Sequence, residues 1–196
     1  MAIAAAGVKI ELREIVLRDK PEQMLEASPK ATVPVLVLPE GNVVDESFDV
    51  MLWALGIADP AHWLSPQSGT AQDTHDLIAA CDGDFKYHLD RYKYAGRYEG
   101  AVAMDHRNSA ERFIAVLEQR LTDEVYLFGA RPSLADYAIM PFIRQFANTD
   151  RGWFEGVPYP KLQAWLRELL ASETFTSVMK KYPRWEPGQS LVLFPS

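Results

Sequence analysis

The sequence predicts an α/β domain over residues 1–57, followed by an all-helical domain over residues 70–196. Before residue 45, apolar residues alternate with polar ones or form short runs of strand length. After residue 76, apolar residues recur every three or four positions along three long stretches. Residues 58–69 contain two prolines and a glycine and are interpreted as a linker.

The α/β domain begins with elements of modest length. Ala2–Ala6 followed by Gly7 is typical of a last helical turn with its glycine cap. Val8–Val16 alternates apolar and polar residues, which predicts a strand with one buried face. Pro21 favours the first turn of a short helix, and Pro29 ends that helix.

A hairpin and a helix complete this domain. Val35–Leu38 is a short apolar strand, and residues 39–42 form a turn of Pro, Glu, Gly and Asn. Val43 and Val44 then supply an antiparallel partner. The following helix is indicated by apolar residues at helical spacing, namely Phe48, Met51, Leu52 and Leu55.

Three apolar stripes define the helical domain, since each repeats at the period of an α-helix. They comprise Leu77, Cys81, Phe85, Leu89 and Tyr92; Ala110, Phe113, Ile114, Leu117 and Leu121; and Leu162, Trp165, Leu166, Leu169 and Leu170. A strand-like pattern returns only in the tail, Leu191–Phe194. Ser133 and Asp136 are spaced as an acidic capping box, which we interpret as structural.

Composition limits the function. The 196 residues carry a net charge of −7, which argues against general nucleic-acid binding. No apolar run is long enough to span a bilayer, and no basic region precedes Ala2–Ala6 as in a signal peptide. The single cysteine excludes an internal disulfide, and a cytoplasmic protein is expected. His88 and Asp84 share a helix face without a further ligand at matching spacing, so no metal site is predicted.

Three motifs carry a family resemblance. They are Lys20-Pro21-Glu22 running into Ser28-Pro29-Lys30-Ala31-Thr32-Val33-Pro34-Val35-Leu36, then Asp45-Glu46-Ser47 ahead of a helix, and Ser133-Leu134-Ala135-Asp136-Tyr137 with Pro141. In this order and spacing the chain resembles the cytosolic glutathione transferases, most closely the Omega-like branch with its bacterial relatives. The resemblance implies a thioredoxin-like N-terminal domain and a helical C-terminal domain.

The resemblance also implies a glutathione site. Val33 and Pro34 would be joined by a cis bond, so that the backbone of Val33 could pair with the cysteinyl part of glutathione. The γ-glutamyl carboxylate would bind at Ser47 and the ammonium at Glu46. Lys20 would contact the glycyl carboxylate. Structural interpretations remain open: a trans proline that opens a strand, an ordinary helix cap, and a solvated lysine.

The sequence departs from the family pattern at three places. Ser28 stands where asparagine is common, and Ala31 where glycine is common. Ala2–Gly7 resembles the end of the helix that follows the family's first strand and catalytic loop, so we expect a truncated domain without a catalytic residue. Without that strand, Val8–Val16 is expected to be displaced, to pair with Val35–Leu38, or to pair with a second chain. Cys81 lies on an apolar stripe and is interpreted as a core residue.

Two functions follow. The first is a glutathione S-transferase-like protein, a homodimer that binds glutathione for thiol transfer or conjugation to a small electrophilic or oxidised substrate. Its expected partners are glutathione and a small molecule, with no nucleic acid, membrane or metal. The alternative is a non-catalytic transferase-like binding or assembly module, because a fold does not determine a function.

Overall fold

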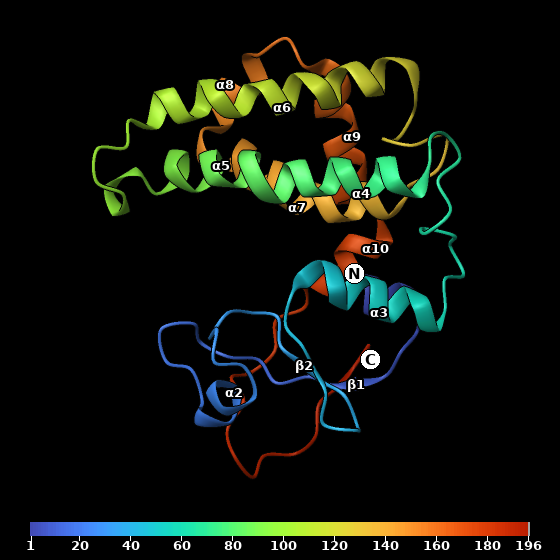
Figure 1. The fold of residues 1–196 in the computed structure, drawn as a ribbon, viewed down its shortest axis with the longest axis vertical. Coiled ribbons are helices and arrows are strands. Elements are labelled where there is room, and N and C mark those ends of the chain that lie inside the picture. Colours follow the sequence, from blue (N-terminus) through green and yellow to red (C-terminus); the bar gives the residue numbers. More distant parts are fainter. Residues whose placement is uncertain (196) are drawn as a thin grey trace. The chain divides into compact units, whose positions relative to one another are not determined.

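In a computed structural model that describes residues 1–195, the chain forms two compact units (Figure 1). The first unit comprises residues 1–61 together with the described residues from 173 onward. The second unit is His62–Ser172. None of the helices in residues 1–195 is both long and apolar enough to span a membrane.

The first unit contains short helices and two-residue strands. Its elements are α1 (Ala2–Ala5), β1 (Ile10–Glu11), α2 (Glu22–Ala27), β2 (Leu36–Val37), β3 (Val43–Val44), α3 (Ser47–Ile57), α10 (Glu173–Thr176), the 3₁₀ turn η3 (Ser177–Met179) and β4 (Leu193–Phe194). The predicted cap of α1 is present. Gly7 has φ +66°, and the N–H of Val8 donates to the C=O of Ile3 at 3.2 Å, which closes the helix end.

The hairpin forms as predicted, but β1 has an unexpected partner. β2 and β3 pair antiparallel, with Leu36 opposite Val44. β1 pairs antiparallel with β4, the tail of the same chain, with Ile10 opposite Phe194. The pairing extends to the N–H of Leu12, which donates to the C=O of Val192 at 2.8 Å. The observed partner is thus the apolar tail of the same chain, whereas Val35–Leu38 contributes β2, which pairs with β3 instead.

This pairing changes the predicted domain limits. The sequence placed residues 70–196 in one helical domain, whereas residues 173–195 group with residues 1–61. The segment predicted as a linker also divides, since residues 62–69 belong to the helical unit. There the indole of Trp63 stacks on the Tyr137 ring at 3.9 Å between centroids. The side-chain oxygen of Gln67 accepts hydrogen bonds from the N–H groups of Ala130 and Arg131.

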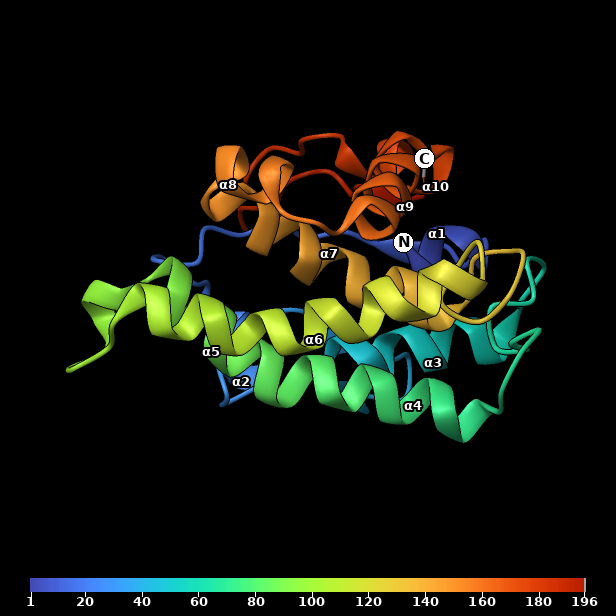
Figure 2. The ribbon, with the colours of Figure 1, turned by 90° about the horizontal axis from the view of Figure 1, so that it is seen from above.

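The second unit is helical throughout. Its elements are α4 (Ala71–Ala80), the π-helix η1 (Cys81–Phe85), α5 (Lys86–Lys93), the 3₁₀ turn η2 (Ala95–Arg97), α6 (Ala103–Asp123), α7 (Leu134–Thr149), α8 (Arg151–Gly156) and α9 (Pro160–Ala171). α6 packs against α5 and α9, and α7 packs against α4 and α5 (Figure 2). The predicted capping box starts α7: Asp136 accepts from the N–H and the hydroxyl of Ser133, each at 2.8 Å.

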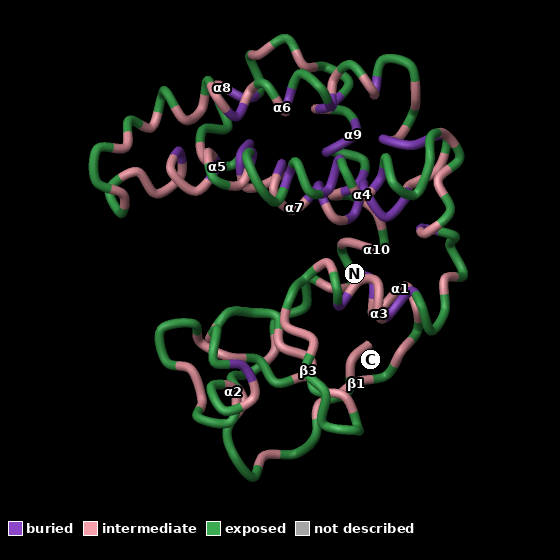
Figure 3. Tube along the Cα trace, in the orientation of Figure 1, coloured by how far each residue is buried: buried purple, intermediate pink, exposed green. Residues whose placement is uncertain are grey.

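Burial differs between the units. In the helical unit nearly all residues of the three apolar stripes are buried, whereas the first unit is mostly exposed or half-buried (Figure 3). The buried apolar residues described in the first unit are Ala2, Val50, Ala54 and Leu55. The predicted sites of ligand recognition therefore lie in the unit with the smaller core.

Candidate functional site

A network of polar side chains joins the turn after α2 to the start of α3. The hydroxyl of Ser28, which is buried, donates to Oδ2 of Asp45 at 2.9 Å. The ammonium of Lys30 donates to Oδ1 of Asp45 at 3.1 Å and to Oε1 of Glu46 at 2.8 Å. These bonds hold two segments that are 15 or more residues apart in sequence. They bring Glu46 and Ser47 to the turn that leads into Val33.

The network also sets the ionisation of its members. The hydrogen bond from Ser28, followed by that from Lys30, lowers the pKa of Asp45 below its usual value. The hydrogen bonds to Glu46 and Asp45 raise the pKa of the Lys30 ammonium. Both shifts favour the charged forms of Asp45 and Lys30. Sequence reasoning missed Lys30 as the shared partner of Asp45 and Glu46, although all three stand inside the quoted motifs.

Val33 presents unused backbone groups. The peptide bond between Val33 and Pro34 is cis, as the resemblance implied. Within residues 1–195, neither the N–H nor the C=O of Val33 takes part in a hydrogen bond. Val33 as a whole residue is 48% exposed. A peptide-like ligand could therefore form an antiparallel pair with this residue.

The N-terminus of α3 offers a place for an anion. Glu46 is the N-cap residue, and its C=O accepts the first helical bond from the N–H of Val50 at 3.0 Å. The N–H groups of Ser47 and Asp49, in the first turn, have no acceptor within the helix. Both Glu46 and Ser47 are exposed, so a carboxylate and an ammonium could approach them together.

Lys20 lies apart from this network. It is half-buried and directly precedes Pro21, the N-cap residue of α2. Among the described residues, no hydrogen bond or ion pair joins Lys20 to Val33, Glu46 or Ser47. The structure thus brings Val33's turn, Glu46 and Ser47 together and leaves Lys20 as a separate candidate.

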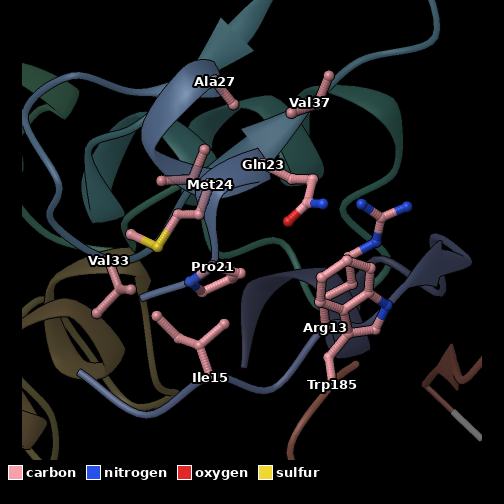
Figure 4. Close-up of a pocket in the computed structure, with 10 residues that line it drawn as sticks. Arg13, Ile15, Pro21, Gln23, Met24, Ala27, Val33, Val37 and Trp185 are labelled. Carbon is pink, nitrogen blue, oxygen red and sulfur yellow. The ribbon is translucent and has the colours of Figure 1, made fainter. Parts of the chain in front are cut away.

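A pocket of about 130 Å³ adjoins Val33 (Figure 4). Met24 and Val33 lie on one side of the open space, and Arg13 and Trp185 lie on the other. The guanidinium of Arg13 stands 4.8 Å from the centre of the Trp185 ring. Sequence reasoning missed this pocket, because Trp185 comes from the distant C-terminal segment and no local pattern connects it with Arg13.

Cys81 does not supply a reactive thiol. It lies in the π-helix with 1% of its surface exposed, in agreement with its predicted place in the core. Burial, with a smaller effect from the charge of Asp82, raises the pKa of the thiol. A protonated and enclosed thiol is a poor nucleophile. This is the only cysteine in the sequence.

His88 forms a pair with a residue that the sequence did not indicate. Its Nδ1 lies 2.8 Å from Nδ1 of His106, across α5 and α6. Asp84 is 3.7 Å from Nε2 of His88. In residues 1–195 no three potential ligands converge as a metal site would require. We interpret the pair as a contact between helices.

Comparison with known proteins gives a consistent result. The profile of "Glutathione S-transferase, N-terminal domain" matches residues 1–56, and that of "Glutathione S-transferase, C-terminal domain" matches residues 78–168. The structure of BphK, a bacterial GST in a ternary complex, has a TM-score of 0.75 at 20% identity; the match covers 91% of this chain and 90% of BphK.

Two further structures are also similar. Glutathione S-transferase-I bound to lactoylglutathione has a TM-score of 0.70 at 21% identity, with 90% of this chain and 89% of that chain covered. A glutathione transferase family member from Pseudomonas fluorescens, solved with two glutathione molecules, has a TM-score of 0.67 at 21% identity, with 80% and 74% covered. The fold is therefore a thioredoxin-like N-terminal domain followed by a helical C-terminal domain, as predicted.

Proposed function

Because the chain belongs to the cytosolic glutathione S-transferase superfamily, we propose that it binds glutathione for thiol transfer or conjugation to a small electrophilic or oxidised substrate. The observation that carries this proposal is the joining of the Ser28–Val33 turn to the N-terminus of α3. That contact places an unpaired backbone edge beside a helix end and a carboxylate. A zwitterionic peptide needs a backbone edge for its peptide groups, a helix N-terminus for its carboxylate and a carboxylate for its ammonium.

Each end of glutathione has a proposed partner. The N–H and C=O of Val33, followed by cis Pro34, pair with the cysteinyl unit. The γ-glutamyl carboxylate binds at the hydroxyl and N–H of Ser47 and the N–H of Asp49, and the γ-glutamyl ammonium binds at Glu46. Lys20, which lies outside the network of Ser28, Lys30, Asp45 and Glu46, receives the glycyl carboxylate.

The chemistry requires a group that lowers the pKa of the glutathione thiol or forms a mixed disulfide with it. Cys81 does not meet this need because its thiol is buried and protonated. We therefore place the catalytic residue outside the set Lys20, Val33, Pro34, Glu46 and Ser47, and we expect no appreciable turnover through Cys81. The Omega-like motifs favour cysteine chemistry. A cytoplasmic homodimer is part of the same proposal.

Ser47→Ala tests the binding site. A lost hydrogen bond to a carboxylate costs about 1.5–3 kcal/mol, so the dissociation constant for glutathione should rise by roughly one to two orders of magnitude in calorimetry. The matched control is Ser68→Ala in the helical unit, which should leave the affinity unchanged. Equal affinities of Ser47→Ala and the parent protein, with binding detectable in both, would exclude Ser47 as a ligand residue.

The burial of Cys81 favours one alternative, a binding or assembly module without catalysis. Retention on immobilised glutathione distinguishes the two when combined with an activity assay. A module retains the ligand and shows no thiol transfer to a mixed disulfide. Robust turnover would exclude the module.

A further inference from the structure

The start of α3 carries an excess of negative charge. Asp45 and Glu46 directly precede the helix, and Asp49 lies in its first turn. A helix N-terminus attracts an anion through its free N–H groups, whereas three carboxylates close to that end repel one. A ligand carboxylate at Ser47 therefore needs a compensating positive charge on the protein.

Lys30 supplies that charge from a distant part of the sequence. Its ammonium donates to Oδ1 of Asp45 at 3.1 Å and to Oε1 of Glu46 at 2.8 Å. Among residues 1–195, Lys30 is the one cation that forms an ion pair with any of the three carboxylates. One ammonium among three carboxylates leaves a negative excess, which a cationic group of a ligand can reduce.

The two carboxylates bonded to Lys30 differ in what they offer a ligand. Asp45 uses both oxygens, because its Oδ2 accepts from the hydroxyl of Ser28 at 2.9 Å, and its side chain is 24% exposed. Glu46 uses Oε1, and its side chain is 59% exposed. Its Oε2 makes no hydrogen bond with the described part of the chain. Lys30 therefore anchors Asp45 and leaves one oxygen of Glu46 for an incoming ammonium.

The charge of Lys30 acts in opposite directions on the two charged groups of an amino-acid end. Its ammonium is bonded to the residue that directly precedes Ser47, so it favours a ligand carboxylate there. It also shares the Glu46 carboxylate with any ligand ammonium, so it disfavours a ligand that brings a positive charge alone. A ligand carboxylate alone still meets the negative excess at the helix start. Only a ligand end with both charges gains at Ser47 and at the free oxygen of Glu46 together.

We propose that Lys30 sets the ligand class of this site, namely thiols that end in a zwitterionic α-amino acid, in preference to thiols that end in a carboxylate alone or an ammonium alone. Lys30 acts through Asp45 and Glu46 and is a positioning residue. The inference rests on the proposed function, because it takes the γ-glutamyl end of glutathione to lie at Ser47 and Glu46. It adds the selectivity of the site and assigns it to a residue outside the proposed glutathione contacts.

Lys30 also connects the Ser28–Val33 turn with α3, and that role alone predicts a different result. Loosening the turn would displace Val33, whose backbone is proposed to pair with the cysteinyl unit. All ligands that contain Cys-Gly would then lose affinity by the same factor. The charge of Lys30 instead predicts changes that depend on the end group of the ligand.

The test is isothermal titration calorimetry on the full chain with three ligands that share Cys-Gly. They are glutathione, glutaryl-Cys-Gly, which lacks the ammonium, and γ-aminobutanoyl-Cys-Gly, which lacks the α-carboxylate. Glutathione should bind the parent protein most tightly. In Lys30→Gln, glutaryl-Cys-Gly should bind roughly threefold more weakly and γ-aminobutanoyl-Cys-Gly roughly threefold more tightly, so the ratio of their dissociation constants changes by about tenfold. Sodium chloride at about 1 M should reduce that change.

Two further variants control the measurement. Lys30→Arg keeps the positive charge and should restore the ratio of the parent protein. Lys86→Gln is the matched control, because Lys86 forms an exposed ion pair of the same length, 3.1 Å, with Asp90 in the helical unit. It should leave all three affinities unchanged. Far-UV circular dichroism establishes that the variants are folded.

Two kinds of failure are distinguishable. If glutathione binds the parent protein but Lys30→Gln leaves the ratio unchanged, through no effect or through an equal loss for all three ligands, the inference about Lys30 is wrong and the proposed function stands. A ratio in Lys30→Arg equal to that in Lys30→Gln would also overturn it. Absence of glutathione binding by the parent protein, or an unchanged affinity in Ser47→Ala, would overturn the proposed position of the γ-glutamyl end and this inference with it.

Discussion

Ala31 adopts a backbone conformation that its side chain disfavours. Its φ is +55°, in the left-handed region, at a position where the family resemblance led us to expect glycine. A residue with a Cβ atom loses roughly 1–2 kcal/mol in this region. Glycine removes that cost but adds entropy to the unfolded chain, which reverses about 0.4–1 kcal/mol of the gain. Ala31→Gly should therefore stabilise the first unit by about 0.5–1 kcal/mol.

Urea denaturation followed by far-UV circular dichroism measures this change. The matched control is Ala79→Gly, at an exposed position inside α4, where glycine should destabilise the helical unit by about 0.5–1 kcal/mol. The two substitutions are chemically identical and should act in opposite directions. If Ala31→Gly lowered stability as Ala79→Gly does, the left-handed assignment of the turn before Val33 would be wrong.

Two more predictions concern stability and the limits of the units. Burial of His88, partly offset by the charge of Asp84, lowers the pKa of this imidazole in the folded state. The unfolded state therefore binds more protons as the pH falls below about 6.5, and the free energy of unfolding should decrease from pH 7 to pH 5. Urea titrations should show a smaller dependence on pH in His88→Gln. Limited proteolysis should cut near residues 59–61 and spare residues 62–70, which are bonded to the helical unit; preferential cutting at Gln67 would contradict that assignment.

The sequence could predict the structures that depend on residues close to one another along the chain. The apolar stripes of the helical unit follow the period of a single helix, and a large core enforces them. The capping box of Ser133 and Asp136 spans three residues and is likewise local. The hairpin depends only on β2, its turn and β3. In each case the residues that interact are close enough in sequence for spacing alone to identify them.

Long-range contacts were missed for a corresponding reason. β1 pairs with β4 across almost the whole chain, and nothing in Val8–Val16 specifies which strand will cover its edge. The bond from Ser28 to Asp45 crosses 17 positions, and each residue taken alone is equally suited to a turn or a helix cap. A π-helix at Cys81–Phe85 interrupts an apolar stripe whose spacing still matches that of an α-helix.

The small core of the first unit connects its stability with its ligands. Few apolar residues are buried there, and the site relies on polar bonds from Ser28 and Lys30, two of which involve exposed groups. Exposed ion pairs contribute little to folding, so the turn before Val33 gains little rigidity from its own contacts. A ligand that binds only the folded unit adds stability in proportion to the logarithm of its concentration. Glutathione bound at the N-terminus of α3 and paired with the backbone of Val33 would therefore increase the order of the turn before Val33.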